Sequence, residues 1–216
     1  MLETGVYYHI FNRGVEKREI FLNPNNYLRM QTILNFYRFK EPPLRLSYFL
    51  RLLPKKQNEI LKTLDDQPKL VDIFCYCLMP NHYHLLLKQL VDGGISTYLA
   101  RIQNSYTRYF NVLNKRVGVL FGGKHKSVRV ITDNQLLYLT FYIHLNPYSS
   151  RIVNSDSELV KYPWSSFSNY LANNPSFCNL DLLGDFRSPE IYAESVLDYK
   201  NSLREKKDLE KLLLDE

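Results

Sequence analysis

Two histidines, His82 and His84, stand one residue apart at the head of an apolar, strand-like segment over residues 82–88. Side chains alternate between the faces of a strand, so both imidazoles are expected on one face, with Tyr83 turned to the other. Two imidazoles on one face supply half of a metal site. The spacing by itself is also compatible with a pair of surface histidines on an amphipathic strand.

A second group of reactive side chains lies at residues 142–147, near the end of a helical pattern. Tyr142 and Asn146 are four residues apart and therefore share one helix face. If that face meets the histidine pair, two imidazoles and an amide oxygen can hold one divalent cation beside a phenol. Such a mixed set of nitrogen and oxygen ligands suits Mn²⁺, or a Mg²⁺ that keeps several waters and binds a substrate phosphate.

The phenol of Tyr142 would serve as a nucleophile towards phosphorus. Because the pKa of a phenol is near 10, it must lose its proton to a base or be made more acidic by positive charge. Lys124, Lys126 and Arg129 are candidates for that charge. A covalent phosphotyrosine would conserve the energy of the cleaved bond and make the reaction a strand transfer. Tyr138 is the rival nucleophile, but it lies two helical turns from Asn146.

The other histidines are given structural roles. His144 lies roughly 200° around the helix from Tyr142, from the 3.6-residue period, so a structural hydrogen bond is expected there. His9 and His125 are interpreted as ordinary strand residues. Cys75 and Cys77 share a strand face and are interpreted as small core residues.

Composition places the chain among globular, basic proteins. Its 216 residues are 45% hydrophobic and 23% charged, with a formal net charge of +6, which fits one ordinary domain plus an appendage. The positive charge and the 17 tyrosines and 12 phenylalanines suit a nucleic-acid partner. Three cysteines without C-x-x-C spacing indicate neither a disulfide framework nor a zinc ribbon, and favour a reducing cytoplasm. No leader-like segment or long apolar run is evident, so we expect neither export nor a membrane span.

The elements that must position these residues follow from hydrophobic periodicity. Strands are predicted over residues 7–13, 71–79, 82–88 and 124–131, and helices over 25–39, 96–114 and 133–145, the last capped by Asp133 and stopped by Pro147. Residues 80–81 form the turn of a hairpin. The order β-α-β-β-α-β predicts an α+β, ferredoxin-like fold, with a four-stranded antiparallel sheet covered on one face by two helices and an extra helix that carries the tyrosine.

Six basic residues are candidates for phosphate contact. The strongest are in the strand beginning at Lys124, where two lysines alternate onto one face. The polar face of helix 96–114 could follow a nucleic-acid strand, but such a stripe is usually only the solvated side of a helix. The six are Arg13, Arg101, Arg108, Lys124, Lys126 and Arg129.

Four motifs, at residues 8–14, 79–86, 142–147 and 162–166, together resemble the single-tyrosine HUH transposases, and most closely the REP-associated tyrosine transposases of bacteria. The resemblance covers about residues 5–170. It implies a cytoplasmic, nucleoid-associated enzyme that binds hairpins in single-stranded DNA, cleaves beside them and forms a 5′-phosphotyrosine with a free 3′ hydroxyl. Carried onto this chain, it makes Tyr142 the nucleophile, His82 and His84 the metal-binding pair, and Asn146 the third ligand of Mg²⁺ or Mn²⁺.

The resemblance divides the chain into a catalytic domain over residues 1–150, with an insertion at about 41–70, and a helical C-terminal extension over 151–216. Two other functions remain open from sequence: a non-catalytic nucleic-acid-binding module, and a metal hydrolase that uses water as its nucleophile. The oligomeric state, monomer or homodimer, is also open.

Overall fold

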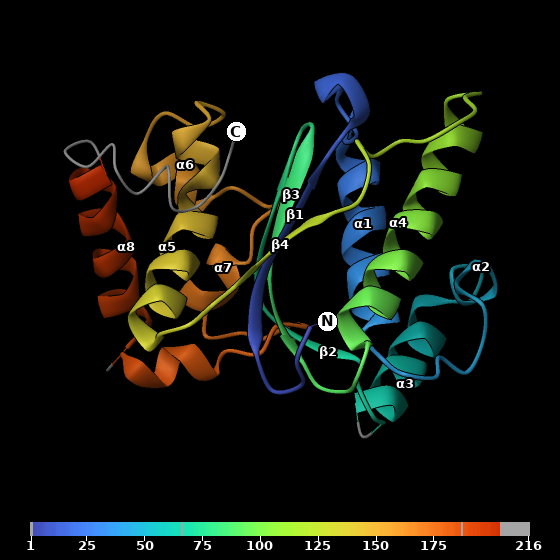
Figure 1. Ribbon diagram of the computed structural model, residues 1–216, viewed down its shortest axis with the longest axis horizontal. Coiled ribbons are helices and arrows are strands. Elements are labelled where there is room, and N and C mark those ends of the chain that lie inside the picture. Colours follow the sequence, from blue (N-terminus) through green and yellow to red (C-terminus); the bar gives the residue numbers. More distant parts are fainter. Residues whose placement is uncertain (1, 66, 187, 204–216) are drawn as a thin grey trace.

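A computed structural model describes residues 2–65, 67–186 and 188–203, and the end of the predicted C-terminal tail, residues 204–216, lies outside the described residues. The fold is α+β around one antiparallel sheet (Figure 1). Its strands are β1 (Tyr7–Arg13), β2 (Val71–Met79), β3 (His82–Gln89) and β4 (Lys126–Arg129), in the order β2-β3-β1-β4. This is the predicted ferredoxin-like sheet, and the fold class is confirmed.

The strand register fixes which side chains share a face. β1 lies in the centre and pairs antiparallel with both β3 and β4, with Phe11 opposite His84 on one side and Lys126 on the other. β4 is shorter than predicted and starts at Lys126, because residues 122–124 bend, with Gly123 at a φ of 98°, before the pairing with β1 begins.

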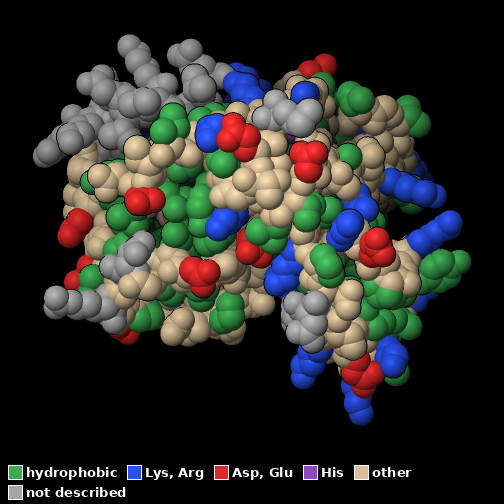
Figure 2. Space-filling model, turned by 60° about the horizontal axis from the view of Figure 1, so that its bottom comes forward, with side chains coloured by type: hydrophobic (Ala, Val, Ile, Leu, Met, Phe, Trp, Pro, Cys, Tyr) green, Lys and Arg blue, Asp and Glu red, His purple; other side chains and the backbone are tan. Residues whose placement is uncertain are grey.

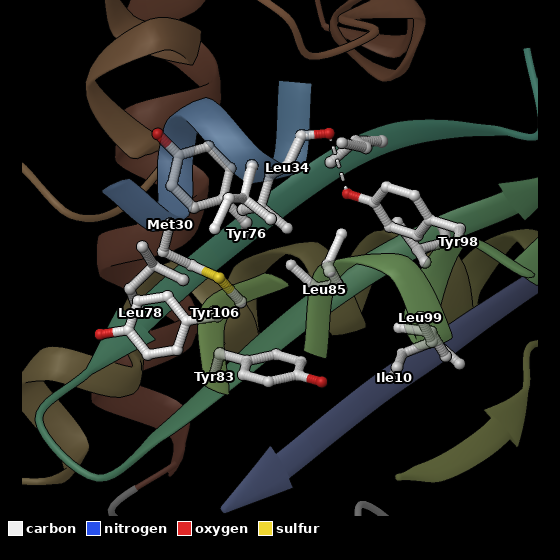
Figure 3. Close-up of a cluster of buried hydrophobic side chains, with 14 of the residues drawn as sticks. Ile10, Met30, Leu34, Tyr76, Leu78, Tyr83, Leu85, Tyr98, Leu99 and Tyr106 are labelled. Carbon is white, nitrogen blue, oxygen red and sulfur yellow. Dashed lines mark hydrogen bonds between the residues drawn. The ribbon is translucent and has the colours of Figure 1, made fainter. Parts of the chain in front are cut away.

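Helices α1 (Pro24–Tyr37) and α4 (Gly94–Leu113) cover one face of the sheet. The side chain of Asn23 accepts a hydrogen bond from the Asn26 amide and caps α1. Figure 3 shows part of the core between these helices and the sheet, where strand residues meet helix residues. Those labelled are Ile10, Met30, Leu34, Tyr76, Leu78, Tyr83, Leu85, Tyr98, Leu99 and Tyr106.

The predicted insertion forms two helices, α2 (Leu46–Phe49) and α3 (Pro54–Asp65). It is anchored in the main core, since the ring of Phe49 packs on that of Phe36 with 5.0 Å between centroids. Its basic side chains are exposed, and Figure 2 shows Lys and Arg side chains gathered on this side of the molecule.

The other face of the sheet is covered by α5 (Asp133–Ser149) and by the C-terminal helices (Figure 1). These are α6 (Asp156–Val160), α7 (Phe167–Leu171) and α8 (Pro189–Leu203); two short 3₁₀ turns lie at Val15–Lys17 and Asp181–Asp185. Cys75 and Cys77 are fully buried here as free thiols, as expected of small core residues. Of the described helices, none combines the length and apolarity needed to cross a bilayer.

Both ends of α5 differ from the sequence prediction. Thr132, rather than Asp133, caps the helix, because its hydroxyl accepts a hydrogen bond from the Gln135 amide at 3.1 Å. The helix also continues through Pro147 to Ser149. Proline in the last turn removes one amide donor, and the Ser150 amide still donates to the Asn146 carbonyl at 2.9 Å, so the turn closes around it.

The segment before α7 closes the free edge of β2. The Leu78 amide donates to the Trp164 carbonyl at 2.8 Å, and the Ser166 amide donates to the Tyr76 carbonyl at 3.0 Å. The indole of Trp164 stacks on Tyr27 at 4.5 Å between centroids. These bonds satisfy backbone groups that an edge strand would otherwise expose, and they join the segment at Trp164 and Ser166 to the sheet.

Candidate functional site

His82 and His84 face the α5 side of the sheet. Their ring centroids lie 5.0 Å apart, His84 is fully buried, and His82 is 8% exposed, so the alternative of a surface pair is wrong. Tyr83 points into the opposite core, where its hydroxyl accepts a hydrogen bond from the Gln103 amide at 2.7 Å. The alternation of a strand therefore separates the two imidazoles from the tyrosine between them.

Both imidazoles are oriented through Nδ1. His82 Nδ1 is bonded to the side-chain oxygen of Asn81 at 2.6 Å, and His84 Nδ1 lies 2.9 Å from Nε2 of His9. A metal would therefore bind through the Nε2 atoms. Hydrogen bonds of this kind fix the ring orientation and the tautomer of a histidine ligand.

His9, expected to be an ordinary strand residue, is part of the site. It is 1% exposed and its ring lies nearly parallel to that of His84, with 5.1 Å between centroids and 18° between planes. Residues 7–13 alternate along their strand, which indicates that His9 and Phe11 share a face. The pairing register of β1 with β3 brings this face beside His84. That register depends on residues far apart in the chain, so the spacing of residues within one segment does not reveal it.

Tyr142 reaches the histidines from α5 of the same chain. Its ring meets His84 edge-on at 5.8 Å between centroids and His9 at 6.1 Å. Asn146 follows one turn later and is 3% exposed, with its amide nitrogen donating to the Tyr142 carbonyl at 3.0 Å. That bond leaves the amide oxygen as the atom of Asn146 able to bind a cation.

Tyr138, the rival nucleophile, points elsewhere. It is 46% exposed and stacks on Tyr199 of α8, with 5.4 Å between ring centroids. The ring contacts therefore place Tyr142 beside His84 and His9, and Tyr138 beside Tyr199 of the C-terminal helix α8.

Burial keeps the imidazoles of His9 and His84 neutral. Desolvation lowers the pKa of His9 to about 3, and it lowers the pKa of His84 well below 6.5, with further contributions from the neighbouring histidines and Arg13. A histidine must be neutral to bind a metal, so at neutral pH these rings need not first lose a proton.

Two of the predicted basic residues lie on the same sheet face as the histidines. Arg13 is directly opposite His82 across the β1–β3 pair, and its charge acts on His84. Lys126 is exposed and opposite Phe11, with its ammonium 5.6 Å from the centre of that ring. They supply positive charge on the Tyr142 side of the sheet.

The other four basic residues are placed elsewhere. Arg129 is opposite Tyr8, on the α1–α4 side, and forms an ion pair with Glu3 at 2.5 Å. Lys124 is exposed in the bend before β4, outside the strand where the alternation of two lysines was predicted. Arg108 is exposed on α4, whereas Arg101 donates to the Phe39 and Lys40 carbonyls at the end of α1.

His144 joins α5 to two other elements. Its Nδ1 lies 2.6 Å from the hydroxyl of Tyr192 on α8, and its Nε2 lies 2.8 Å from the hydroxyl of Ser166. The ring is fully buried, and desolvation lowers its pKa to about 3. This is the structural hydrogen-bonding role expected from its position on the helix.

The chemistry of the donor set decides whether a divalent cation fits. Across the described residues no group of three or more His, Cys, Asp or Glu side chains is arranged so that it could hold a metal ion, which argues against a structural zinc site there. Two imidazoles and one amide oxygen fit a cation such as Mn²⁺ or Mg²⁺ that takes its remaining ligands from water and phosphate.

Comparison with known proteins supports the fold. No protein-family model matches the sequence, and no curated protein matches it significantly. Among solved structures, the chain is similar to "Structure of the REP associates tyrosine transposase bound to a REP hairpin", with a TM-score of 0.55 and 14% sequence identity, over 84% of this chain and 87% of that one. The fold of this chain is therefore that of a REP-associated tyrosine transposase structure.

Proposed function

We propose that the protein is a metal-dependent single-stranded DNA endonuclease and strand transferase that uses Tyr142 as its nucleophile. The observation that carries the proposal is the edge-on contact of the Tyr142 ring with His84, 5.8 Å between centroids, within a single chain. A phenol beside an oriented imidazole that can bind a metal suits attack on a phosphodiester held at that metal.

In the first step, the Tyr142 oxygen attacks phosphorus and forms a new P–O bond. The bond from phosphorus to the 3′ oxygen breaks, the phenolic proton passes to solvent, and the leaving oxygen takes up a proton as a free 3′ hydroxyl. The 5′ phosphate remains on Tyr142. Attack on it by a 3′ hydroxyl reverses these bond changes, joins the strands and restores the phenol.

Arg13 and Lys126 supply the positive field for this step. Arg13 acts electrostatically on His84, and Lys126 projects from the same sheet face. Fixed positive charges favour the phenolate over the phenol and attract the phosphate, which lowers the barrier to attack. Neither role needs a carboxylate base beside the tyrosine.

His82, His84 and Asn146 would hold the divalent cation, with both imidazoles bound through Nε2. The cation would polarise the scissile phosphate and stabilise the charge that develops on the leaving oxygen. The protein contributes the orientation: hydrogen bonds of the two imidazoles to Asn81 Oδ1 and His9 Nε2 hold the rings, and the bond from Asn146 to its own helix holds the amide.

Hairpins in single-stranded DNA are the proposed substrates. The structure similar in fold is described as bound to a REP hairpin. This chain also carries a net charge of +6, and exposed basic side chains gather on the side of the molecule that carries α2 and α3 (Figure 2), which suits a phosphate backbone.

The test uses one hairpin oligonucleotide labelled at either end and incubated with Mn²⁺ or Mg²⁺. A 5′-phosphotyrosine predicts that the 3′-labelled strand becomes a protein adduct stable to denaturation, and that the 5′-labelled strand yields a shorter free fragment. Tyr142→Phe should abolish the adduct, and Tyr138→Phe, the matched control, should retain it. Cleavage without an adduct would indicate a water nucleophile, and binding without cleavage a non-catalytic module; either result contradicts the proposal.

A further inference from the structure

The contact between His9 and His84 is an unusual support for a metal-binding histidine. A histidine ligand commonly donates its second ring N–H to a carboxylate, a backbone carbonyl or water. Here the group 2.9 Å from His84 Nδ1 is another imidazole nitrogen, Nε2 of His9, and both residues are buried. Backbone pairing of β1 with β3 holds this geometry, in which the two rings are nearly parallel, with 18° between their planes.

We propose that His9 is a positioning residue that accepts the Nδ1 proton of His84 and thereby presents His84 Nε2 to the divalent cation. The inference rests on the proposed function, since it requires His84 to bind the metal. It assigns to the first strand a task in metal binding, although His9 itself does not bind the cation.

The tautomers of the pair follow from counting protons. Two neutral imidazoles share one hydrogen bond, so only one of the two facing nitrogens carries a proton. If His9 donates, His84 carries its proton on Nε2 and cannot bind a metal through that atom. If His84 donates, its Nε2 has a lone pair, and the proton of His9 resides on Nδ1. Metal binding therefore selects the second arrangement of both rings together.

The far side of His9 supports a functional role for the pair. His9 Nδ1 is buried and has no hydrogen-bond partner among the described residues. A buried polar atom without a partner reduces stability, and an aromatic hydrocarbon ring of similar size would avoid that cost. Stability alone therefore gives no reason for an imidazole at this position, whereas an acceptor for His84 does.

Three substitutions of His9 distinguish a role as hydrogen-bond acceptor from a role in which its ring only fills space. His9→Gln places an amide oxygen as many bonds from the backbone as Nε2, His9→Asn reaches only as far as Nδ1, and His9→Phe keeps a ring without nitrogen. Mn²⁺ affinity is measured without DNA, from the electron paramagnetic resonance signal of the free ion. We expect His9→Phe and His9→Asn to bind Mn²⁺ about tenfold or more weakly, and His9→Gln to bind close to wild type.

Thermal unfolding and hairpin binding in EDTA establish that each variant is folded. If the phenylalanine variant does not fold, the asparagine and glutamine pair still decides the question. Equal Mn²⁺ affinity of wild type and the variants that lack the acceptor would overturn the role of His9, as would a folded His9→Gln protein that binds no better than His9→Asn. Adduct formation by wild-type protein tests the proposed function separately, so a working Tyr142 with an irrelevant His9 is distinguishable from failure of both.

Discussion

The ring of Tyr142 on α5 meets the ring of His84 on β3 edge-on, with 5.8 Å between centroids, and both belong to the same chain. The predicted nucleophile and a predicted metal ligand are therefore brought together without a second subunit. α5 is held in this position by its packing on β2 and β3 and by the bonds of His144 to Tyr192 and Ser166.

An active site within one chain predicts the result of a mixing experiment. Tyr142→Phe and His84→Gln proteins should each be inactive, and an equimolar mixture should remain inactive, because neither chain has a complete set of residues. Adduct formation is measured on denaturing gels after co-incubation. Recovery of a substantial fraction of wild-type adduct in the mixture would mean that tyrosine and histidines from different chains cooperate.

The two faces of the sheet predict different effects for two basic residues of β4. Lys126→Ala should slow adduct formation by about tenfold or more, because it removes positive charge on the Tyr142 side. Arg129→Ala should leave the cleavage rate of bound DNA near wild type, since Arg129 lies on the α1–α4 side and pairs with Glu3. The two variants are compared by their single-turnover rates of adduct formation at saturating protein. Equal losses of rate in the two variants would argue against a local effect of Lys126.

Tyr192→Phe should destabilise the protein by about 1–3 kcal/mol, because it leaves Nδ1 of the buried His144 without its hydrogen-bond partner. Tyr138→Phe is the matched control, since it removes a hydroxyl from an exposed tyrosine, and it should change stability little. Urea unfolding measures both. A Tyr192→Phe protein as stable as the control would show that this hydrogen bond does not hold α8 to α5.

Stability of the metal-free protein should fall as the pH drops below about 6.5. Burial lowers the pKa of His144 to about 3 in the folded state, whereas the unfolded chain binds its proton near 6.5. The unfolded state therefore takes up more protons between these values, and His144 alone should remove about 2 kcal/mol between pH 7 and pH 5. Urea unfolding in EDTA at several pH values measures this slope. His144→Gln should reduce it, and an unchanged slope would contradict the assignment.

Most of the secondary structure could be predicted because it depends on the spacing of apolar residues within each short segment. The first strand, the hairpin and the helices agree with the observed elements to within a few residues. The differences between the predicted and the observed elements lie at the ends of the elements. Thr132 displaces Asp133 as the cap of α5 because its hydroxyl is the one that bonds the Gln135 amide, and Pro147 is accommodated because it falls in a last turn that later amides still close.

The sequence by itself determined that His82 and His84 share a face and that Tyr142 and Asn146 share another, because the periods of a strand and a helix are properties of the backbone. Only the tertiary structure decided that these faces meet, that Arg13 and Lys126 lie on this side while Arg129 lies on the other, and that His9 supports His84. Strand register and helix placement join site residues that lie far apart in the chain, such as His9 and Tyr142, which are 133 positions apart. Such contacts depend on how whole faces pack, which spacing along the sequence does not encode.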